Sequence, residues 1–344
     1  MPAAMRTFLN KIGALLLAAL LATAALPGGA HAAAKSRKEK KKSEAPAPEK
    51  KLSAYEKLFK DKESRTAEGL FKLHIIDGKL YTEIPLDILE REFVINTTIE
   101  ASSLADYGLA GQQPLPPYHI TFSRRDSLVR MHEVPRRTLS DSDAGIARAL
   151  ELSSAMPIVA SYPIKAYNAD STAVVIENTA LFMSDNEHLK AFEARGMSPL
   201  HISRASYKAD RSLLRDVEGG KDYASVISDM TYGVTTQYFI FIICKDKPFT
   251  ARARRTVTIL PEECAPARIA DPRIGVLPVP FTRFTAEQGT RPAYFASRIN
   301  FRPGGEIRPV TFYIDTLFTP AWQRGIRRGI ALWNEAFRRI GMGD

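Results

Sequence analysis

The segment His132-Glu133-Val134-Pro135-Arg136 is the part of the sequence that comes nearest to a zinc-protease motif. That motif is His-Glu-x-x-His, because a spacing of four residues puts both imidazoles on one face of a helix with the glutamate beside them. Here the fifth residue is Arg136, and Pro135 would interrupt the helix where the second ligand belongs. We therefore interpret His132 as a residue of an edge strand and not as a metal ligand.

The remaining histidines after residue 32 are isolated in the sequence: His74, His119, His188 and His201. His74 and His119 lie in strand-like stretches, which is typical of surface or hydrogen-bonded core histidines. The sequence has no Gly-x-Ser-x-Gly nucleophile elbow, no phosphate-binding or dinucleotide-binding glycine loop and no Cys-x-x-Cys pair. We therefore assign no catalytic, cofactor-binding or metal-binding residue to this sequence.

The two cysteines, Cys244 and Cys264, do not form a metal site. In an oxidising compartment they permit one disulfide. Cys244 also ends a strongly apolar run, where a buried free thiol is equally natural. The sequence leaves both alternatives open.

The first 51 residues predict export. Arg6 and Lys11 precede an apolar run that ends at Pro27-Gly28-Gly29, and the small residues around His31 form a cleavage site. This is the layout of a secretory signal peptide over residues 1–32, with no transmembrane segment left after cleavage. We expect the mature protein in the periplasm, associated with the outer membrane or outside the cell.

Residues 33–51 are rich in lysine, glutamate, proline and alanine, which predicts a disordered linker. They hold eight basic and three acidic side chains. Much of the net charge of +10 therefore lies in this tether, where residues 38–42 could make weak contact with an anionic envelope surface. The body from residue 52 has 38 basic and 35 acidic side chains, so it is nearly neutral, and export removes nucleic acid as a partner.

The part of the chain that follows the linker begins with strand-like segments. Residues 71–76 and 79–84 predict two strands joined by Asp77-Gly78. Asp-Gly supplies the two positive φ angles of a type I′ turn, so the strands should form a hairpin. Residues 92–99 predict a third strand and residues 55–59 a short helix. Together they make a small β-rich N-terminal domain over residues 52–104.

The next stretch, residues 108–117, is rich in glycine and proline and predicts a long loop. A second hairpin is predicted at 118–123 and 128–134, and a helix at 140–152 with Ser140 and Asp141 as capping residues. Further strands are expected at residues 158–167, 173–177, 223–232, 238–244, 256–260 and 294–302. These many short strands predict a mainly antiparallel β domain over residues 105–305.

The character of the sequence changes after residue 305. Residues 309–315 predict a strand, and Thr319-Pro320 predict a helix cap followed by proline at the first helical position. The helix has one apolar stripe at spacings of three and four residues, formed by Trp322, Ile326, Ile330, Trp333, Phe337 and Ile340. Gly341 supplies the C-terminal stop. We expect this stripe to pack on a sheet and not to lie on a membrane or nucleic acid.

Three groups of residues carry a family resemblance. The first is Gly69-Leu70-Phe71 with Leu80-Tyr81-Thr82-Glu83-Ile84-Pro85, and the second is Asp271-Pro272-Arg273-Ile274-Gly275. The third is the 309–315 strand with Trp322, Trp333-Asn334-Glu335-Ala336-Phe337 and Ile340-Gly341. In this order they resemble the N-terminal domains, of unknown function, and the opening strand and helix of the protease domain in a family of large exported bacterial zinc-dependent metalloproteases.

The resemblance implies a zincin-type protease in which a His-Glu-x-x-His helix and a further ligand hold zinc. The glutamate activates the zinc-bound water for attack on a peptide carbonyl. Those residues are absent from this sequence, so zinc and a peptide or protein substrate are expected only for the full-length family member. We expect this chain to be the N-terminal, non-catalytic portion, with residues 306–344 as the truncated start of the protease domain.

The predicted fold class is therefore α+β and mainly antiparallel β. It comprises a small N-terminal β unit, a larger β-rich domain, and then the first strand and helix of an α/β zincin-like domain. With its sheet missing, the 306–344 segment should be poorly packed or borrow the surface of the β domain. The alternative function is that of a non-catalytic envelope protein, rich in β-structure, that binds protein or glycan.

Overall fold

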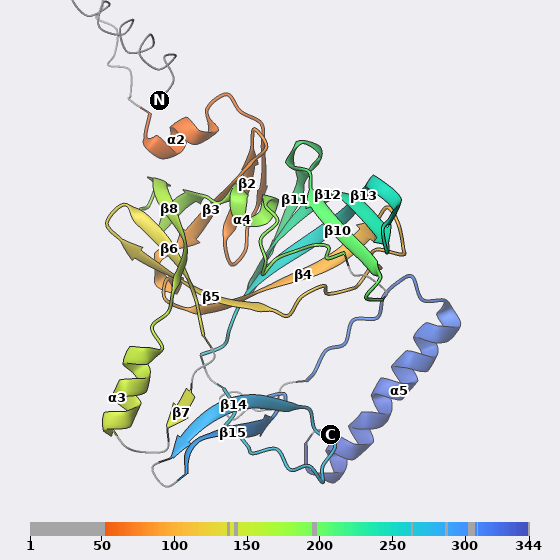
Figure 1. The fold of residues 1–344 in the computed structure, drawn as a ribbon. Helices are drawn as coiled ribbons and strands as arrows, with labels where there is room; N and C mark the ends of the chain where they lie inside the picture. The colour runs from red at the N-terminus through yellow and green to blue at the C-terminus, as the bar shows by residue number, and fades with distance from the viewer. Residues whose placement is uncertain are drawn as a thin grey trace, which may run out of the picture. The chain divides into compact units, whose positions relative to one another are not determined.

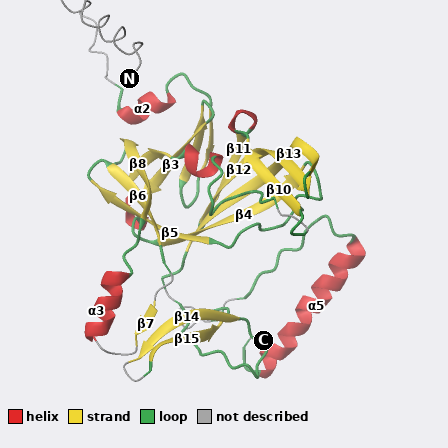
Figure 2. Ribbon diagram, in the orientation of Figure 1, coloured by secondary structure: helices red, strands yellow, loops and turns green. Residues whose placement is uncertain are grey.

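The computed structural model describes residues 52–135, 138–140, 144–194, 198–262, 264–285, 288–301, 307 and 309–342. The predicted leader and linker, residues 1–51, lie outside these residues, and so does Asp141. Strands dominate the described part of the chain, and helices are few (Figure 2).

The first strands are β1 (Ser64–Ala67), β2 (Lys72–Ile76), β3 (Lys79–Pro85), β4 (Glu92–Ser102), β5 (Tyr118–Arg125), β6 (Leu128–Glu133), β7 (Thr138–Ser140) and β8 (Ile158–Tyr167). The later strands are β9 (Ala173–Glu177), β10 (His201–Tyr207), β11 (Leu213–Gly220), β12 (Tyr223–Tyr238), β13 (Phe241–Ile259), β14 (Pro278–Thr285) and β15 (Gly289–Ala296). The α-helices are α2 (Ala54–Phe59), α3 (Ala144–Ser153), α4 (Thr179–Met183) and α5 (Pro320–Arg339), and the 3₁₀ helices are η2 (Leu86–Ile88) and η3 (Ala209–Arg211).

Twelve of the described strands form one antiparallel sheet in the order β1-β2-β3-β9-β8-β6-β5-β4-β13-β12-β10, with β11 also paired to β12 (Figure 1). The sheet curls until β11 lies beside β1 and β2. At this seam the Leu70 amide donates a 2.7 Å hydrogen bond to the Gly220 carbonyl, and the Arg65 guanidinium donates to the Arg215 carbonyl. Strands from residues 52–104 and from residues 105–305 therefore share one sheet.

A small mixed sheet joins three further strands in the order β15-β14-β7. β14 and β15 are antiparallel, whereas β7 runs parallel to β14. Ser140, predicted to cap a helix, is instead the last residue of β7. The described part of the chain is thus mainly antiparallel β, with one large and one small sheet.

The predicted β2–β3 hairpin is confirmed, because Asp77 and Gly78 have φ angles of 51° and 73°. The predicted helix at 55–59, the strand at 92–99 and the hairpin at 118–134 also form, as α2, β4 and β5–β6. His132 does not lie on an edge strand, because β6 pairs with β5 on one side and β8 on the other.

Two strand predictions are wrong. Residues 238–244 do not form one strand: Tyr238 ends β12 and Phe241 begins β13, so a tight turn interrupts the apolar run. Residues 309–315 are not a strand, and no described strand pairs with them. The segment predicted at 294–302 is a strand only as far as Ala296. A strand needs a partner for its backbone groups, which an apolar composition alone does not supply.

Strand β13 shows how the core is built from alternating side chains. Its inward residues Phe249, Ala251, Ala253 and Val257 are buried and belong to the hydrophobic core. Arg255 occupies the same inward row and is 0% exposed. The period of two in a strand therefore places one guanidinium among apolar side chains.

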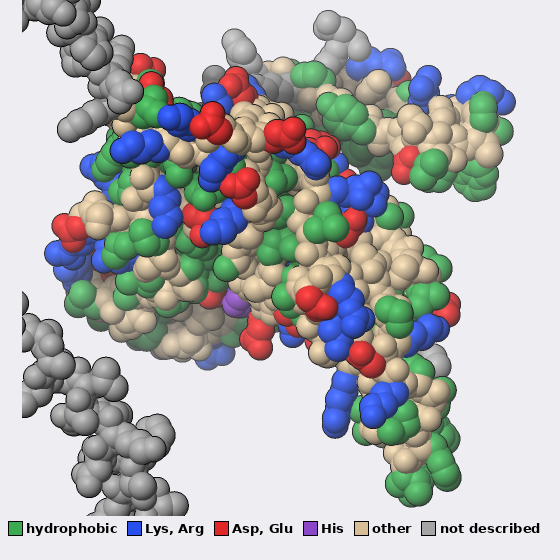
Figure 3. Space-filling model, turned by 90° about the horizontal axis from the view of Figure 1, so that it is seen from above, with side chains coloured by type: hydrophobic (Ala, Val, Ile, Leu, Met, Phe, Trp, Pro, Cys, Tyr) green, Lys and Arg blue, Asp and Glu red, His purple; other side chains and the backbone are tan. Residues whose placement is uncertain are grey.

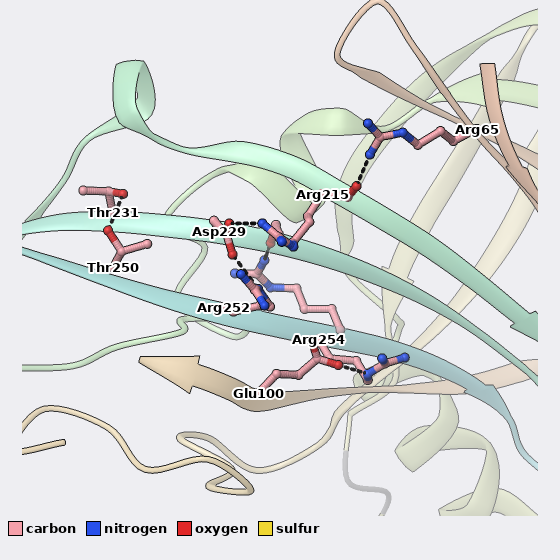
Figure 4. A network of polar contacts seen from close by, with 10 residues as sticks. Arg65, Glu100, Arg215, Asp229, Thr231, Thr250, Arg252 and Arg254 are labelled. Atoms are coloured by element: carbon pink, nitrogen blue, oxygen red, sulfur yellow. Dashed lines mark hydrogen bonds and ion pairs between the residues drawn. The ribbon is translucent and has the colours of Figure 1, made fainter. Parts of the chain in front are cut away.

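The outward residues of β13 and its neighbours form a ladder of ion pairs (Figure 4). Arg252 of β13 and Arg215 of β11 bind Asp229 of β12, at 2.9 and 3.0 Å. Arg254 binds Glu100 of β4 at 2.5 Å and also Glu218 of β11. These partly exposed pairs contribute less than about 1 kcal/mol each. Basic and acidic side chains are likewise interspersed in the view from above (Figure 3).

Helix α5 forms where the sequence predicts it. Pro320 is its first residue, and Gly341 has a φ angle of 71° beyond its end. The amides of Gly341 and Met342 bond the carbonyls of Arg338 and Phe337, which satisfies the last turn. The prediction that its stripe packs on a sheet is wrong for the described residues, because no side chain of α5 is buried. None of the described helices combines the length and apolar character needed to cross a membrane.

Candidate functional site

A cavity of ≈ 620 Å³ lies where β4 and β5 begin and β6 ends. We call it the Tyr118 cavity. Six titratable side chains line it: Glu92, Tyr118, His119, Glu133, Glu187 and His188. Its described lining residues include no serine, threonine or cysteine.

The register of the sheet brings four of these side chains together in two pairs. Glu133 lies opposite Ile120 in the β5–β6 ladder, so it is the diagonal neighbour of Tyr118. Glu92 lies opposite Thr121 in the β4–β5 ladder, so it is the diagonal neighbour of His119. Diagonal neighbours two residues apart share one face of a sheet and lie within reach of long side chains.

Tyr118 is held in its neutral form. Burial raises the pKa of its hydroxyl to about 12, with a further contribution from the nearby carboxylate of Glu133, to which the hydroxyl is hydrogen-bonded. Its ring stacks on the imidazole of His188, with the two centroids 4.2 Å apart and the planes inclined by 4°. The hydroxyl proton of Tyr118 is therefore directed at Glu133, and one face of its ring is covered by His188.

His119 and Glu92 form the second pair. The Nε2 atom of His119 lies 3.0 Å from Oε2 of Glu92, which is the distance of an ion pair. The same Nε2 atom is buried and has no hydrogen-bond partner among the described residues, so the contact is electrostatic and not a directed hydrogen bond.

His188 is positioned by Arg255, which lies outside the cavity. The Arg255 guanidinium donates from Nε and Nη2 to the carbonyl of Leu189, at 3.1 and 2.9 Å. Its Nη1 donates to the Phe182 carbonyl at 2.7 Å and to Oγ of Ser228 at 2.9 Å. Burial lowers the pKa of Arg255 to about 10, so the group remains charged at neutral pH. The Arg255 guanidinium thus binds the loop after α4 to strand β13 and fixes the position of His188.

The Tyr118 cavity offers several groups that can hold a ligand by hydrogen bonds. Three carboxylates and two imidazoles can accept hydrogen bonds from a cationic or donor-rich ligand. Among the described lining residues the hydroxyl is that of Tyr118, which is held neutral and directed at Glu133. In the part of the chain that the structure describes, no group of three or more His, Cys, Asp or Glu side chains is placed to hold a metal ion.

A second cavity, of ≈ 910 Å³, lies between the loop after β4 and the far ends of β10, β12 and β13. His201 and Cys244 both line it. The thiol of Cys244 donates a weak 3.7 Å hydrogen bond to the Val234 carbonyl, so it is tied to its own hairpin. Both Cys244 and Cys264 are free, so the disulfide that the sequence permits is not formed.

The remaining histidines lie elsewhere. Oγ of Ser123 and Nε2 of His132 are 2.7 Å apart, which makes His132 a hydrogen-bonded strand residue. His74 is 2% exposed; its Nδ1 is 2.9 Å from Oγ1 of Thr66, and its Nε2 is 3.6 Å from the carboxylate of Glu83. The hydroxyl of Tyr55 donates to the same carboxylate at 3.1 Å.

Sequence reasoning considered His119 and His188 one at a time and missed that they line one cavity. The pairing of β4, β5 and β6 brings His119 to the cavity, and the loop after α4, bound to Arg255 through Leu189, brings His188. Arg255 carried a usable signal, because it stands in the inward row of an alternating apolar strand. In the Asp271–Gly275 segment, Arg273 clasps the carboxylate of Asp271 at 2.5 Å as a local loop contact.

Two family models match the chain. Residues 115–303, more than half of the chain, match a domain of unknown function (DUF5117), and residues 52–102 match a second domain of unknown function (DUF5118). No curated protein and no solved structure matches. The chain therefore belongs to the family defined by the domain of unknown function DUF5117.

Proposed function

We propose that this chain is the N-terminal, non-catalytic portion of an exported zinc-dependent metalloprotease. In this proposal the zinc, its ligands and the glutamate that activates the water belong to residues outside this sequence. The described β-structure carries no part of the zinc chemistry. The observation that carries the proposal is the apolar stripe of helix α5, in which no side chain is buried.

Helix α5 is well formed but lacks a core. Its stripe residues Trp322, Trp333 and Ile340 are each 67% exposed. The aromatic contact of the stripe is between Phe337 and Phe301, whose ring centroids are 5.0 Å apart. Most of the stability of a helix in a protein comes from packing its apolar face, so this stripe needs a cover. In this proposal the rest of a protease domain, whose opening strand and helix residues 309–341 resemble, would supply it.

The leader supports the exported half of the proposal. Arg6 and Lys11, the apolar run and the small residues near His31 have the order of a secretory signal peptide. Peptide or protein is the substrate class proposed for the whole protease. The β-rich part would then act at the cell envelope or outside the cell.

Metal analysis tests whether this chain is non-catalytic, and the DNA sequence tests whether it belongs to a protease. The purified chain should hold far less than one zinc per molecule and should not hydrolyse peptides. Stoichiometric zinc together with hydrolysis that a chelator stops would overturn the non-catalytic assignment. The DNA after the codon for Asp344 should encode His-Glu-x-x-His in one of its frames. If no frame encodes it, the protease assignment fails.

The Tyr118 cavity favours a second candidate, a non-catalytic envelope protein that binds protein or glycan. Its carboxylates Glu92, Glu133 and Glu187 suit a basic peptide or the hydroxyl groups of a sugar. Calorimetry with a lysine-rich peptide and with a chitin oligosaccharide would test this function. Binding of either probe that Glu187→Gln weakens supports it, and absence of binding by both excludes it for these ligands.

A further inference from the structure

The turn between β12 and β13 exposes an unbroken apolar segment, which we call the apolar tip. The exposed fractions of its six residues run from 50% to 73%: Tyr238, Phe239, Ile240, Phe241, Ile242 and Ile243. Leu200 and Ile202 of the adjoining β10 region are also exposed, at 49% and 40%. Exposed apolar patches of this kind mark interaction surfaces.

The tip lies on a narrow ribbon of strands. β4 pairs with β13 only between Ala251 and Ile259. Before Ala251, β13 is paired on one side alone, with β12, in the described part of the chain. β12 continues to Tyr238, where it pairs with His201 of β10. The ribbon of β10, β12 and β13 therefore extends beyond the end of β4 (Figure 1).

Both faces of this ribbon are apolar at the tip. Phe241, Ile242 and Ile243 are consecutive in β13, and each is more than half exposed. Because successive side chains of a strand point to opposite faces, these residues cover both sides of the ribbon. A flat protein surface or a second sheet would cover one face. An apolar medium that surrounds the tip covers both faces at once.

The residues of the turn support the same conclusion. Phe239 has a φ angle of 52°, a conformation that is costly for a bulky side chain. Turns of this size favour asparagine, aspartate or glycine at such positions. The requirements of the turn therefore do not explain the choice of Phe239 and Ile240. Their side chains, 61% and 73% exposed, are placed at the outermost point of the hairpin.

Basic residues follow directly behind the tip. Lys245 and Lys247 are exposed, and Lys245 lies two residues, or about 7 Å along the strand, beyond Ile243. The carboxylate of Asp246 is bound to Lys208 at 2.9 Å. The positive charges of Lys245 and Lys247 thus exceed the local negative charge. Lysines at this depth behind an apolar anchor are suited to lipid phosphates.

We propose that the apolar tip inserts into a lipid surface with anionic headgroups, and that Lys245 and Lys247 contact those headgroups. Phe239, Ile240 and Phe241 would lie among the acyl chains next to the headgroup layer. This anchoring goes beyond the proposed protease role and does not depend on it. Zinc analysis and vesicle binding report on the two proposals separately.

Vesicle flotation of the purified chain tests the proposal. The chain should float with vesicles of phosphatidylglycerol and phosphatidylcholine. The double variant Phe239→Ser/Ile240→Ser should bind the vesicles at least roughly tenfold more weakly. The reason is that it loses the transfer free energy of two apolar side chains. Lys245→Gln/Lys247→Gln should weaken binding to the anionic vesicles but leave binding to pure phosphatidylcholine unchanged.

Matched variants separate the tip from other apolar surfaces. Ile274→Ser/Leu277→Ser alters two side chains that are 61% and 79% exposed outside the hairpin, and it should float like the unaltered chain. Trp322→Ser/Trp333→Ser, on helix α5, should float equally well. Loss of flotation in the α5 variant together with normal flotation of the tip variant would overturn the proposal.

Light scattering on the same proteins covers the remaining outcome. If the unaltered chain does not bind vesicles and instead forms a dimer that the tip variant abolishes, the tip is a contact between copies and the lipid proposal fails. All eight side chains substituted in these variants are exposed, so circular dichroism should show unchanged folding for each variant. Normal spectra then assign any loss of flotation to the surface itself.

Discussion

The guanidinium of Arg255 satisfies oxygens that lie inside the protein and would otherwise have no partner. It reaches the carbonyls of Leu189 and Phe182 and the hydroxyl of Ser228. An unsatisfied buried acceptor costs about 1–3 kcal/mol, and hydrogen bonds to charged groups are among the stronger ones. The residue thus links core stability to the position of the loop that carries His188.

Replacing Arg255 by methionine should lower the free energy of unfolding by roughly 3 kcal/mol or more, because at least two carbonyls lose their donor. Urea unfolding followed by circular dichroism measures this. Arg254→Met is the matched control, since the neighbouring arginine lies on the outward face and makes partly exposed ion pairs. Its cost should stay below about 1 kcal/mol. Equal costs for both variants would contradict the role given to Arg255.

His74 predicts a loss of stability in mild acid. Burial, partly offset by Glu83, lowers the pKa of His74 below its ordinary value of 6.5. As the pH falls through 6.5, the unfolded chain therefore takes up this proton before the folded chain does. The contribution of neutral His74 to the free energy of unfolding is complete above pH 6.5. Below that pH this free energy falls by at most about 1.4 kcal/mol per pH unit.

Urea unfolding at about pH 7.5 and at about pH 5.5 measures this effect. His74→Asn removes the titrating ring and should reduce the difference in unfolding free energy between the two conditions. His132→Asn, also in a strand, should keep it. An unchanged difference in the His74 variant would show that other groups cause the acid sensitivity.

At the scale of the elements, the β12–β13 turn stores a local strain. Phe239 has a φ of 52°, and a left-handed conformation costs a residue with a side chain about 1–2 kcal/mol. Phe239→Asn should therefore raise the unfolding free energy by roughly 1 kcal/mol, because asparagine tolerates this region better. Phe241→Asn, two residues on, makes the same exchange outside the positive-φ region and should give no gain. Chemical denaturation of both variants checks the prediction.

Helix α5 should be the first element that a protease removes. Its side chains are not buried, whereas the core strands are covered on their inner face. Trypsin should therefore cut at the arginines of α5 well before it cuts within β2 to β13, and mass spectrometry of timed samples would show the order. If α5 resists as long as the sheet does, its stripe is covered in solution and the case for a missing cover is lost.

Much of the fold can be predicted from local residue chemistry. The wrong predictions concern features that depend on contacts between distant parts of the chain. Asp77-Gly78 predicts its hairpin because those residue types suit both positive φ angles. The turn at Phe239 has no such residue, so residues 238–244 looked like one strand. Residues 309–315 have the composition of a strand but no described partner. The Tyr118 cavity could not be predicted, because it depends on the register among β4, β5 and β6.

For the molecule as a whole, the seam between β11 and the β1–β2 connection closes the curled sheet. A Cβ on Gly219 would lie 2.3 Å from the Glu68 carbonyl oxygen, and a Cβ on Gly69 would lie 2.5 Å from the Gly220 nitrogen. Gly219→Ala should thus force the seam apart and cost roughly 1–3 kcal/mol of stability. Gly275→Ala, where a Cβ meets nothing within 4 Å, should be nearly neutral. Thermal unfolding of the two variants measures the contrast.

Strand β4 has a consequence for inheritance. It ends the first matched segment, yet it lies between β5 and β13, and β3 pairs with β9. A gene that kept only one segment would encode a sheet with several unpaired edges in its middle, which invites aggregation. Recombination should therefore move the two segments as a pair. In genomes, breakpoints should fall outside residues 52–303, and a protein carrying one segment without the other should need a new partner for β4.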